Sequence, residues 1–414
     1  MRSEERGGRR EEGKRRAGAS AGAESGKRKA CHSRELMSFP RTPCHSREHH
    51  VIPAKAGIQD PCRRQEGKRL RVRKEVKRQN EPELVTLGLG AGGRASSDFV
   101  RMRLAPLFGG LDLEDAAIIK VNGPSVAFTT DSFVVDPLFF PGGDIGRLAV
   151  FGTVNDLAVR GAAPAWLSLG VVAAEGFPMS ALMDVMKSVG AAAREAGVRV
   201  VTGDTKVVDR ESLNGLILNT AGIGDIISGA RVSADRVRAG DAVVVSGPIG
   251  AHELAVLSSR HGLGLGGLLS DCAPISVLTA GMVKEFGHGV KWMRDPTRGG
   301  LATVLNEFAA AQNAAVAIDE NAVPIDDNIR DAADILGLDP FYLACEGRFV
   351  AIVDKSVAAA VVGWLHRAPG GRAAAEIGSV VTVGPDNPKV ELYTKFGSRR
   401  ILRYLAADQQ PRIC

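Results

Sequence analysis

From Glu83 onward, strand-like segments rich in β-branched residues alternate with amphipathic segments of helical length. This alternation predicts an α+β or α/β fold. Ser180 is expected as the N-cap of one helix, and Gly197 as the residue just past its end. Strands are expected over 127–135, 165–173, 198–208, 213–223 and 241–246, and helices over 147–160, 180–196, 251–260, 297–312 and 355–366.

A polar, charged stretch from Gly229 to Gly240 interrupts this pattern. It predicts a boundary between two domains, 83–228 and 240–405, each long enough to bury its own core. Residues 406–414 follow as a polar tail in which Pro411 disfavours a helix.

Residues 1–80 have a different composition, with many Arg, Lys, Glu, Gly and Ser and no apolar periodicity. They hold 23 of the 53 Lys and Arg residues and 10 of the 47 Asp and Glu residues, which leaves 30 and 37 for the rest. We expect a disordered basic extension here, or an artefact of an overlong gene model. A basic interaction arm, or a metal site built from His45, His49 and His50, is the alternative.

The charge split weakens the case for nucleic-acid binding that the net charge of +6 suggests, because the body of the chain is acidic. No stretch reaches the roughly 20 apolar residues of a membrane span, and the N-terminus has no apolar signal-peptide core. The cysteines of the body, Cys272, Cys345 and Cys414, are scattered and predict neither a zinc site nor a disulfide framework. We therefore expect a cytoplasmic protein without nucleic-acid or membrane partners.

A glycine loop at 88–93 is the first of several chemistry-bearing motifs. It satisfies the GxGxxG pattern after a strand-like run, which is compatible with a dinucleotide site or with a simple strand-to-helix turn. In either case Gly90, Gly92 and Gly93 offer exposed backbone N–H groups suited to phosphate.

Four carboxylates follow at expected strand ends and helix starts, each in a short polar motif. Each alone is compatible with a turn or cap residue. Together with the glycine loop they predict a site for a divalent cation and a polyphosphate, and Mg²⁺ prefers such oxygen ligands. No P-loop pattern is present, so ATP would be held through metal and loops. The candidate ATP ligands are Asp131, Asn155, Asp156, Asp204, Thr205, Asp295 and Thr297, with Asp131, Asp156 and Asp295 as metal ligands.

Lys206 and Glu346 are candidate bases. Lys206 adjoins Asp204, where it could neutralise phosphate or move a proton. Glu346 follows an apolar run in Cys345-Glu346-Gly347-Arg348 and is expected to be half-buried with a raised pKa, or to be an exposed turn residue.

Cys414 is the last residue of the sequence and has little to pack against. A mobile thiol is open to oxidation unless it is used, so we expect a reactive role. From Asp408, the tail can span up to about 23 Å at ~3.3 Å per residue. That reach would carry the thiol between an internal pocket and a partner.

These motifs resemble those of the HypE family of hydrogenase expression/formation proteins. The resemblance covers about four-fifths of the chain, from Glu83 to Cys414, and its most specific element is the terminal PRIC. Several motifs are shared with the wider superfamily of aminoimidazole ribonucleotide synthetase and selenophosphate synthetase. The matching segments are Asp131–Ser132, VVDPLFFPGG (134–143), NDLAV (155–159), VTGDTKVV (201–208), RDPTRGGL (294–301), CEGRF (345–349) and PRIC (411–414).

The resemblance implies a carbamoyl dehydratase that makes the cyanide ligand of [NiFe]-hydrogenase. Cys414 would receive a carbamoyl group from the carbamoyltransferase HypF, and ATP would phosphorylate the carboxamide oxygen. Lys206 and Glu346 would strip the nitrogen protons, and the cyano group would pass to iron on a HypC–HypD scaffold complex. The implied architecture is a homodimer whose N-terminal domains form a shared β-barrel, with α/β C-terminal domains.

Two features depart from the family: Leu89 stands where a histidine is usual, and the extension 1–80 has no counterpart. Selenophosphate synthetase is the nearest enzymatic alternative, although Cys62 lies far from the glycine loop and Cys414 would be unexplained. An NAD-dependent dehydrogenase would rest on the glycine loop alone. A thiol carrier or scaffold without ATP turnover is the non-enzymatic alternative.

Overall fold

A computed structural model describes residues 93–104, 106, 114–121, 123, 125–384 and 388–405. The predicted extension 1–80, Gly90, Gly92 and the tail 406–414 lie outside these residues. The described part begins with helix α1 (Gly93–Phe99), which continues as a π-helical turn (Val100–Leu104). None of the described helices has the length and apolar character needed to cross a bilayer.

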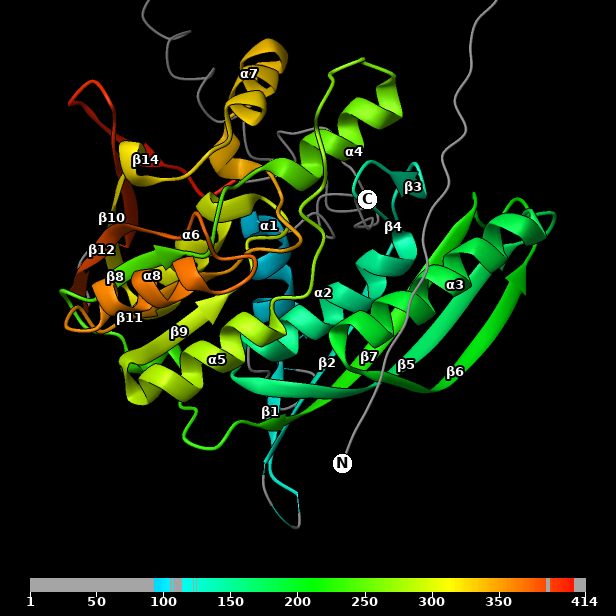
Figure 1. The fold of residues 1–414 in the computed structure, drawn as a ribbon, viewed down its shortest axis with the longest axis horizontal. Helices are drawn as coiled ribbons and strands as arrows, with labels where there is room; N and C mark the ends of the chain where they lie inside the picture. Colours follow the sequence, from blue (N-terminus) through cyan, green and yellow to red (C-terminus); the bar gives the residue numbers. More distant parts are fainter. Residues whose placement is uncertain are drawn as a thin grey trace, which may run out of the picture. The chain divides into compact units, whose positions relative to one another are not determined.

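The first sheet has five strands in the order β1-β2-β7-β5-β6 (Figure 1). Only the β5–β6 pair is parallel. A small hairpin of β3 (Phe139–Phe140) and β4 (Gly143–Asp144) precedes the first covering helix. The strands are β1 (Ala117–Ile119), β2 (Val126–Phe133), β5 (Ala162–Ala174), β6 (Arg199–Val208) and β7 (Leu216–Ile226).

Helices α2 (Ile145–Val159) and α3 (Met179–Ala196) accompany this sheet. Asp144 caps α2, because its carboxylate accepts hydrogen bonds from the backbone N–H groups of Gly146 and Arg147. Nearly every residue of α2 is buried, which explains its almost uniformly apolar sequence. The helix packs on β2, β5 and β7 and also contacts α3 and α5 (Ser276–Phe286).

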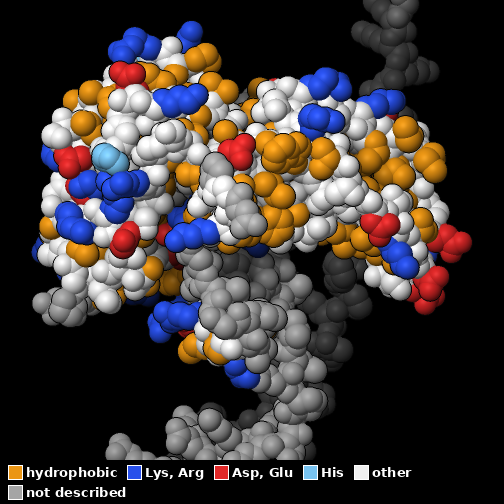
Figure 2. All heavy atoms as spheres, turned by 90° about the horizontal axis from the view of Figure 1, so that it is seen from below, with side chains coloured by type: hydrophobic (Ala, Val, Ile, Leu, Met, Phe, Trp, Pro, Cys, Tyr) orange, Lys and Arg blue, Asp and Glu red, His pale blue; other side chains and the backbone are white. Residues whose placement is uncertain are grey.

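No helix of the described residues covers the other face of this sheet, which we call the bare face. Phe128, Ile223 and Trp166 pair across β2, β7 and β5, and they are 37%, 37% and 42% exposed. Figure 2 shows hydrophobic side chains gathered on the underside of the molecule, where Figure 1 places this sheet. The sheet of a single chain is open, not the closed barrel that the family resemblance implies for a dimer.

The second sheet has seven strands in the order β14-β13-β10-β12-β8-β11-β9, with β10 and β13 parallel. Its strands β8 and β11 are buried on both faces, so β8 is the continuous apolar run Ala-Val-Val-Val. The strands are β8 (Ala242–Val245), β9 (Val290–Arg294), β10 (Ala314–Asp319), β11 (Val350–Val353), β12 (Ala375–Val383), β13 (Lys389–Tyr393) and β14 (Arg399–Leu402).

Helix α6 (Gly300–Gln312) packs with Val243 and Val245 on one face of this sheet. On the other face, α5 and α8 (Ala358–Arg367) pack with Ala242 and Val244. Helices α4 (Ala251–His261) and α7 (Asp327–Leu336) pack against each other. Side chains of α4 also join the apolar cluster of α2, so the two sheets are linked through shared core packing.

Two sequence predictions about helix ends need correction. The helix α3 begins at Met179 with Pro178 as its N-cap, so Ser180 lies inside the first turn and caps nothing. The helix expected from Thr297 begins only at Gly300, because Gly299 takes the left-handed cap conformation at φ 72°. Gly197, in contrast, ends α3 in the left-handed conformation as expected, at φ 71°.

Candidate active site

Three carboxylates from separate parts of the chain meet between the two sheets. Asp115 precedes β1, Asp156 lies in the last turn of α2, and Asp295 follows β9. One oxygen of each lies within 4.8 Å of the others. The hydroxyl of Thr129 on β2 lies 3.0 Å from Asp156 Oδ2 and 2.9 Å from the Asp115 carbonyl oxygen, which holds the group together.

Burial and mutual repulsion raise the pKa values of these carboxyls. Burial, then Asp295 and Asp115, raises the pKa of Asp156 well above its usual range. Burial, then Asp115, raises the pKa of Asp295 to about 7. Burial also raises the pKa of Asp115, although Arg294 opposes it. Three clustered anions of this kind are stabilised by a cation.

The residues present fit a divalent cation such as Mg²⁺. Asp115 Oδ2 is buried and has no hydrogen-bond partner among the described residues, while its side chain is only 9% exposed. A buried oxygen without a partner costs about 1–3 kcal/mol, and more when charged. A hard cation ligated by Asp115, Asp156 and Asp295 would supply the missing interaction.

Asp131 and Glu346 stand beside this cluster. Burial raises the pKa of Asp131, while Arg298, 3.6 Å from its Oδ1, lowers it. Burial, followed by Asp295, raises the pKa of Glu346 well above its usual range. A raised pKa makes the carboxylate form of Glu346 a stronger base.

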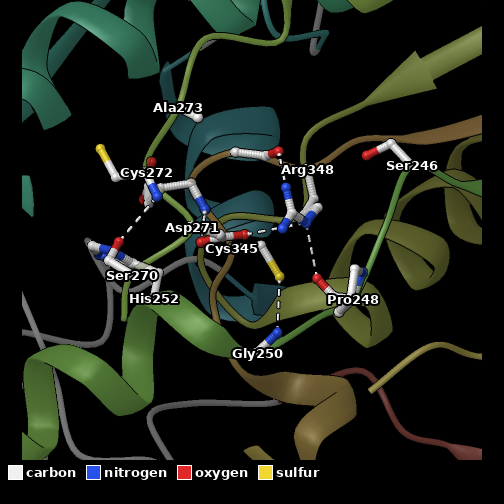
Figure 3. A network of polar contacts seen from close by, with 12 residues as sticks. Ser246, Pro248, Gly250, His252, Ser270, Asp271, Cys272, Ala273, Cys345 and Arg348 are labelled. Carbon is white, nitrogen blue, oxygen red and sulfur yellow. Dashed lines mark hydrogen bonds and ion pairs between the residues drawn. The ribbon is translucent and has the colours of Figure 1, made fainter. Parts of the chain in front are cut away.

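A polar network holds the loop that carries Glu346, and Figure 3 shows its members Asp271, Cys345 and Arg348. The Glu346 backbone N–H donates to Asp271 Oδ1 at 3.0 Å. Next to it, a Cβ on Gly347 would lie 1.9 Å from the Asp271 carbonyl oxygen, so only glycine fits. Arg348 donates from Nε to the Pro248 carbonyl oxygen at 3.0 Å, and Cys345 Sγ accepts from the Gly250 N–H at 3.1 Å. The Cys345-Glu346-Gly347-Arg348 motif is therefore held rigidly from several sides.

Asn155 has a supporting position. Its Nδ2 donates to the carbonyl oxygens of Ala273 and Glu346, each at 3.1 Å, and its Oδ1 accepts from the Ile275 N–H at 2.9 Å. The amide thus has a backbone partner for each of its polar atoms and is almost fully buried. We assign it to holding α2 against the loop of Glu346, although the sequence suggested a nucleotide ligand.

Asp204, Thr205 and Lys206 lie on β6 and are exposed. Lys206 pairs with Val172, and Asp204 with Gly170, which places both on the bare face of the first sheet. Asp131 pairs with Thr220 on the opposite, helix-covered face. A single chain therefore does not bring Lys206 and Asp204 together with the carboxylate cluster.

The remaining predicted residues have mixed positions. Gly93 is left-handed at φ 70°, and a Cβ there would lie 2.8 Å from the Leu405 carbonyl oxygen. Thr297 is half-buried beside Asp295, and its carbonyl oxygen accepts from the Gly300 N–H. Gly90, Gly92 and Cys414 lie outside the described residues.

Sequence reasoning missed Asp115 as a cluster member. Only the tertiary structure reveals the position of Asp115, because it places Arg294 Nε 2.7 Å from Asp115 Oδ1. Burial disfavours the charged guanidinium, but Asp115 and Glu307 outweigh it and raise the pKa of Arg294.

Comparisons with known proteins find relatives over most of the chain. The AIR synthase related protein family matches with its N-terminal domain over residues 113–226 and its C-terminal domain over 238–390. The carbamoyl dehydratase HypE of Bradyrhizobium diazoefficiens is 44% identical over 334 residues, which cover 80% of this chain and 96% of that protein.

The chain belongs to the HypE family.

Solved HypE structures share its fold. A HypE–HypF complex aligns with a TM-score of 0.70 at 39% identity, covering 74% of this chain and 99% of the other. A HypE in complex with ATP aligns with a TM-score of 0.68 at 44% identity, covering 80% and 100%. The HypE fold thus includes both sheets described above.

Proposed function

We propose that this HypE-family chain is the carbamoyl dehydratase that converts a carboxamide on the Cys414 sulfur into a thiocyanate, with ATP as the phosphoryl donor. The observation that carries the proposal is the buried carboxylate cluster with Glu346 at its side. The 44% identity to a carbamoyl dehydratase HypE and the likeness to an ATP-bound HypE support it.

The amide oxygen is a poor leaving group, and phosphorylation makes it a good one. The carboxamide oxygen attacks the γ-phosphorus of ATP, and ADP leaves. The C–O bond then breaks as inorganic phosphate departs, the nitrogen loses both protons, and the C≡N bond forms. The net change is carboxamide plus ATP to thiocyanate, ADP, phosphate and a proton.

Each described residue has a role in this scheme. Asp115, Asp156 and Asp295 would hold Mg²⁺, which neutralises phosphate charge as it develops. Glu346 would take a proton from the amide nitrogen, and Asn155 keeps its loop in place. We infer that Gly90, Gly92, Gly93, Asp131 and Thr297 line the nucleotide.

A second copy of the chain would supply Lys206 to the active site. Among the described residues, strand β1 pairs only with Val126–Phe128 of β2, and no strand pairs with the outer edge of β6. Both edges are therefore open in the part of the chain that the structure describes. Placing β6 of one copy beside β2 of another would close both sheets into one barrel and remove their edges. Lys206, Asp204 and Thr205 would then lie next to the partner's β2, and we infer that Lys206 takes the second proton.

Substitution on the bare face tests this homodimer. Trp166→Asp puts a charge into the proposed interface, whereas Ile335→Asp changes a residue of α7 that is 71% exposed. Sedimentation velocity should show a dimer for the parent chain and for Ile335→Asp, and a monomer for Trp166→Asp. A parent chain that sediments as a monomer would rule out the shared barrel.

The transferred carbamoyl and cyano groups indicate which proteins would be partners. The HypE–HypF complex supports HypF as the carbamoyl donor. A HypC–HypD complex holding iron is the proposed cyanide acceptor. We place the N-terminal domain at 83–228, the C-terminal domain at 240–405 and the carrier tail at 406–414, and we propose a cytoplasmic location, which reduced thiol chemistry suits.

Mass spectrometry of the C-terminal peptide tests the function. After incubation with HypF and carbamoyl phosphate, the peptide should gain one carbamoyl group on Cys414. Addition of Mg-ATP should then remove the mass of one water, and Cys414→Ala should do neither. An adduct that persists with Mg-ATP would leave only a thiol carrier.

A further inference from the structure

The last described residues, 402–405, are tied to the body of the protein at four points. The hydrogen bonds are Asn306 Nδ2 to the Leu402 carbonyl oxygen (3.0 Å), Tyr342 Oη to that of Arg403 (3.0 Å), Tyr404 Oη to Glu307 Oε1 (3.1 Å) and the Arg94 N–H to the Leu405 carbonyl oxygen (3.0 Å). We call residues 402–405 the tail base.

One of these contacts continues to the carboxylate cluster. Tyr404 donates to Glu307 Oε1, and Glu307 Oε2 lies 3.4 Å from Arg294 Nη2. Arg294 Nε in turn lies 2.7 Å from Asp115 Oδ1. An unbroken series of polar contacts thus joins the tail base to a proposed cation ligand.

The series lies largely out of water. The side chains of Arg294 and Glu307 are 20% and 21% exposed, and that of Asp115 is 9% exposed. Charge interactions are screened less in such surroundings than at the surface. Arg294 forms ion pairs with both Asp115 and Glu307, so a change at Asp115 alters its interaction with Glu307.

A divalent cation on Asp115 would repel the guanidinium and compete for the carboxylate. The Arg294–Asp115 ion pair would then weaken, and the Arg294–Glu307 ion pair would become stronger. Because Arg294 uses Oε2 and Tyr404 uses Oε1, both contacts can persist together. A Glu307 side chain with less freedom to move is a better-positioned hydrogen-bond acceptor for the Tyr404 hydroxyl.

We propose that Tyr404 is a positioning residue that couples the tail base to the cation site through Glu307 and Arg294. The inference rests on the proposed function only in taking Asp115, Asp156 and Asp295 as the cation ligands. Coupling of this kind is reciprocal: if the cation tightens the tail base, the intact tail base must tighten cation binding by the same factor.

Tyr404→Phe tests the coupling, because it removes one hydroxyl and keeps the ring. Tyr393→Phe, on β13 and 42% exposed, is the matched control. Mn²⁺ serves as the probe for the full-length chain, since electron paramagnetic resonance counts the free ion. Tyr404→Phe should bind Mn²⁺ about fivefold more weakly than the parent chain, and Tyr393→Phe should match the parent. Mn²⁺ should also slow hydrogen exchange of the tail base in the parent chain, and much less in Tyr404→Phe.

The outcomes separate the coupling from the site itself. Equal Mn²⁺ affinity of Tyr404→Phe and the parent chain would overturn the coupling and leave the cation site standing. A parent chain that binds no Mn²⁺ would remove the cation site and the coupling together. A thermal unfolding midpoint of Tyr404→Phe near that of Tyr393→Phe would show that a weaker affinity is not caused by general loosening.

Discussion

The backbone N–H of Arg94 donates a hydrogen bond to the carbonyl oxygen of Leu405 at 3.0 Å. The contact joins the end of the glycine loop to the base of the tail that bears Cys414. It requires glycine at position 93, where a Cβ would lie 2.8 Å from the same carbonyl oxygen. The close contact with Leu405 therefore explains why position 93 is glycine, without reference to phosphate binding.

Gly93→Ala should loosen the tail base and slow dehydration about tenfold, because the reacting group is then held less precisely. Gly197→Ala is the matched control, since Gly197 has nearly the same φ, 71°, but nothing within 4 Å of its Cβ position. Both variants carry the left-handed strain of about 1 kcal/mol. Hydrogen exchange should rise over residues 402–405 in Gly93→Ala alone; equal exchange in the two variants would refute the close-contact argument.

Asp115→Asn should weaken Mg²⁺ binding and lower the dehydration rate by about 100-fold, because it removes a charged ligand of the cluster. Asp331→Asn, on the exposed side of α7, should leave both unchanged. The rates are measured over a range of Mg²⁺ concentrations, and high Mg²⁺ should partly restore Asp115→Asn. A normal Mg²⁺ dependence would remove Asp115 from the site.

Mixed dimers test whether Lys206 serves the partner's site. Lys206→Ala and Glu346→Gln chains, each inactive alone, are unfolded and refolded together. Random pairing makes half of the dimers mixed, and each mixed dimer then has one complete site, so about a quarter of the parent activity should return. No recovery would show that Lys206 and Glu346 must come from the same chain, which the opposite faces of the first sheet argue against.

The long helices and strands could be predicted from the periodicity of the sequence. The tertiary contacts between their side chains could not. The helix α3 was placed within one residue of its observed bounds, because eighteen residues carry a clear amphipathic pattern. Its start was misjudged, since Pro178 occupies the N-cap and Ser180 follows it. Local preference for serine at a cap gave way to the fixed backbone of proline.

In the candidate site, too, some residues could be predicted from the sequence and others could not. Asp156 and Asp295 can be predicted as candidates because each lies in a short polar motif within or at the start of an expected helix. Asp115 cannot, because it lies in an irregular segment and gains its role only through Arg294 and the distant Asp156. Asp204 and Lys206 lie in one of the predicted polar motifs, but strand alternation and the order of strands place both away from the cluster. Such tertiary and subunit relationships leave no local pattern.

Glu253 should make stability depend on pH. It is buried, and burial raises its pKa from 4.5 to about 7, although the Ala344 N–H donates to its Oε2 at 2.8 Å. The stability associated with this group is present below pH 4.5 and is lost as pH rises through 7, because the unfolded state ionises first. The loss is on the order of 3 kcal/mol.

Glu253→Gln keeps an acceptor for Ala344 and removes the ionisation. Relative to the parent chain, it should gain about 2 kcal/mol of unfolding free energy between pH 5 and pH 8. Urea unfolding at the two pH values measures this difference, with Glu285→Gln on the exposed side of α5 as control. A constant difference between parent and Glu253→Gln would show that Glu253 titrates normally.

The most direct test of the account follows one oxygen atom. Cys414 is loaded with a carbamoyl group whose carbonyl oxygen is ¹⁸O, and Mg-ATP is added in unlabelled water. Phosphorylation of that oxygen predicts one ¹⁸O in inorganic phosphate for each thiocyanate formed. Unlabelled phosphate, with ¹⁸O released to water or kept on the peptide, would contradict it.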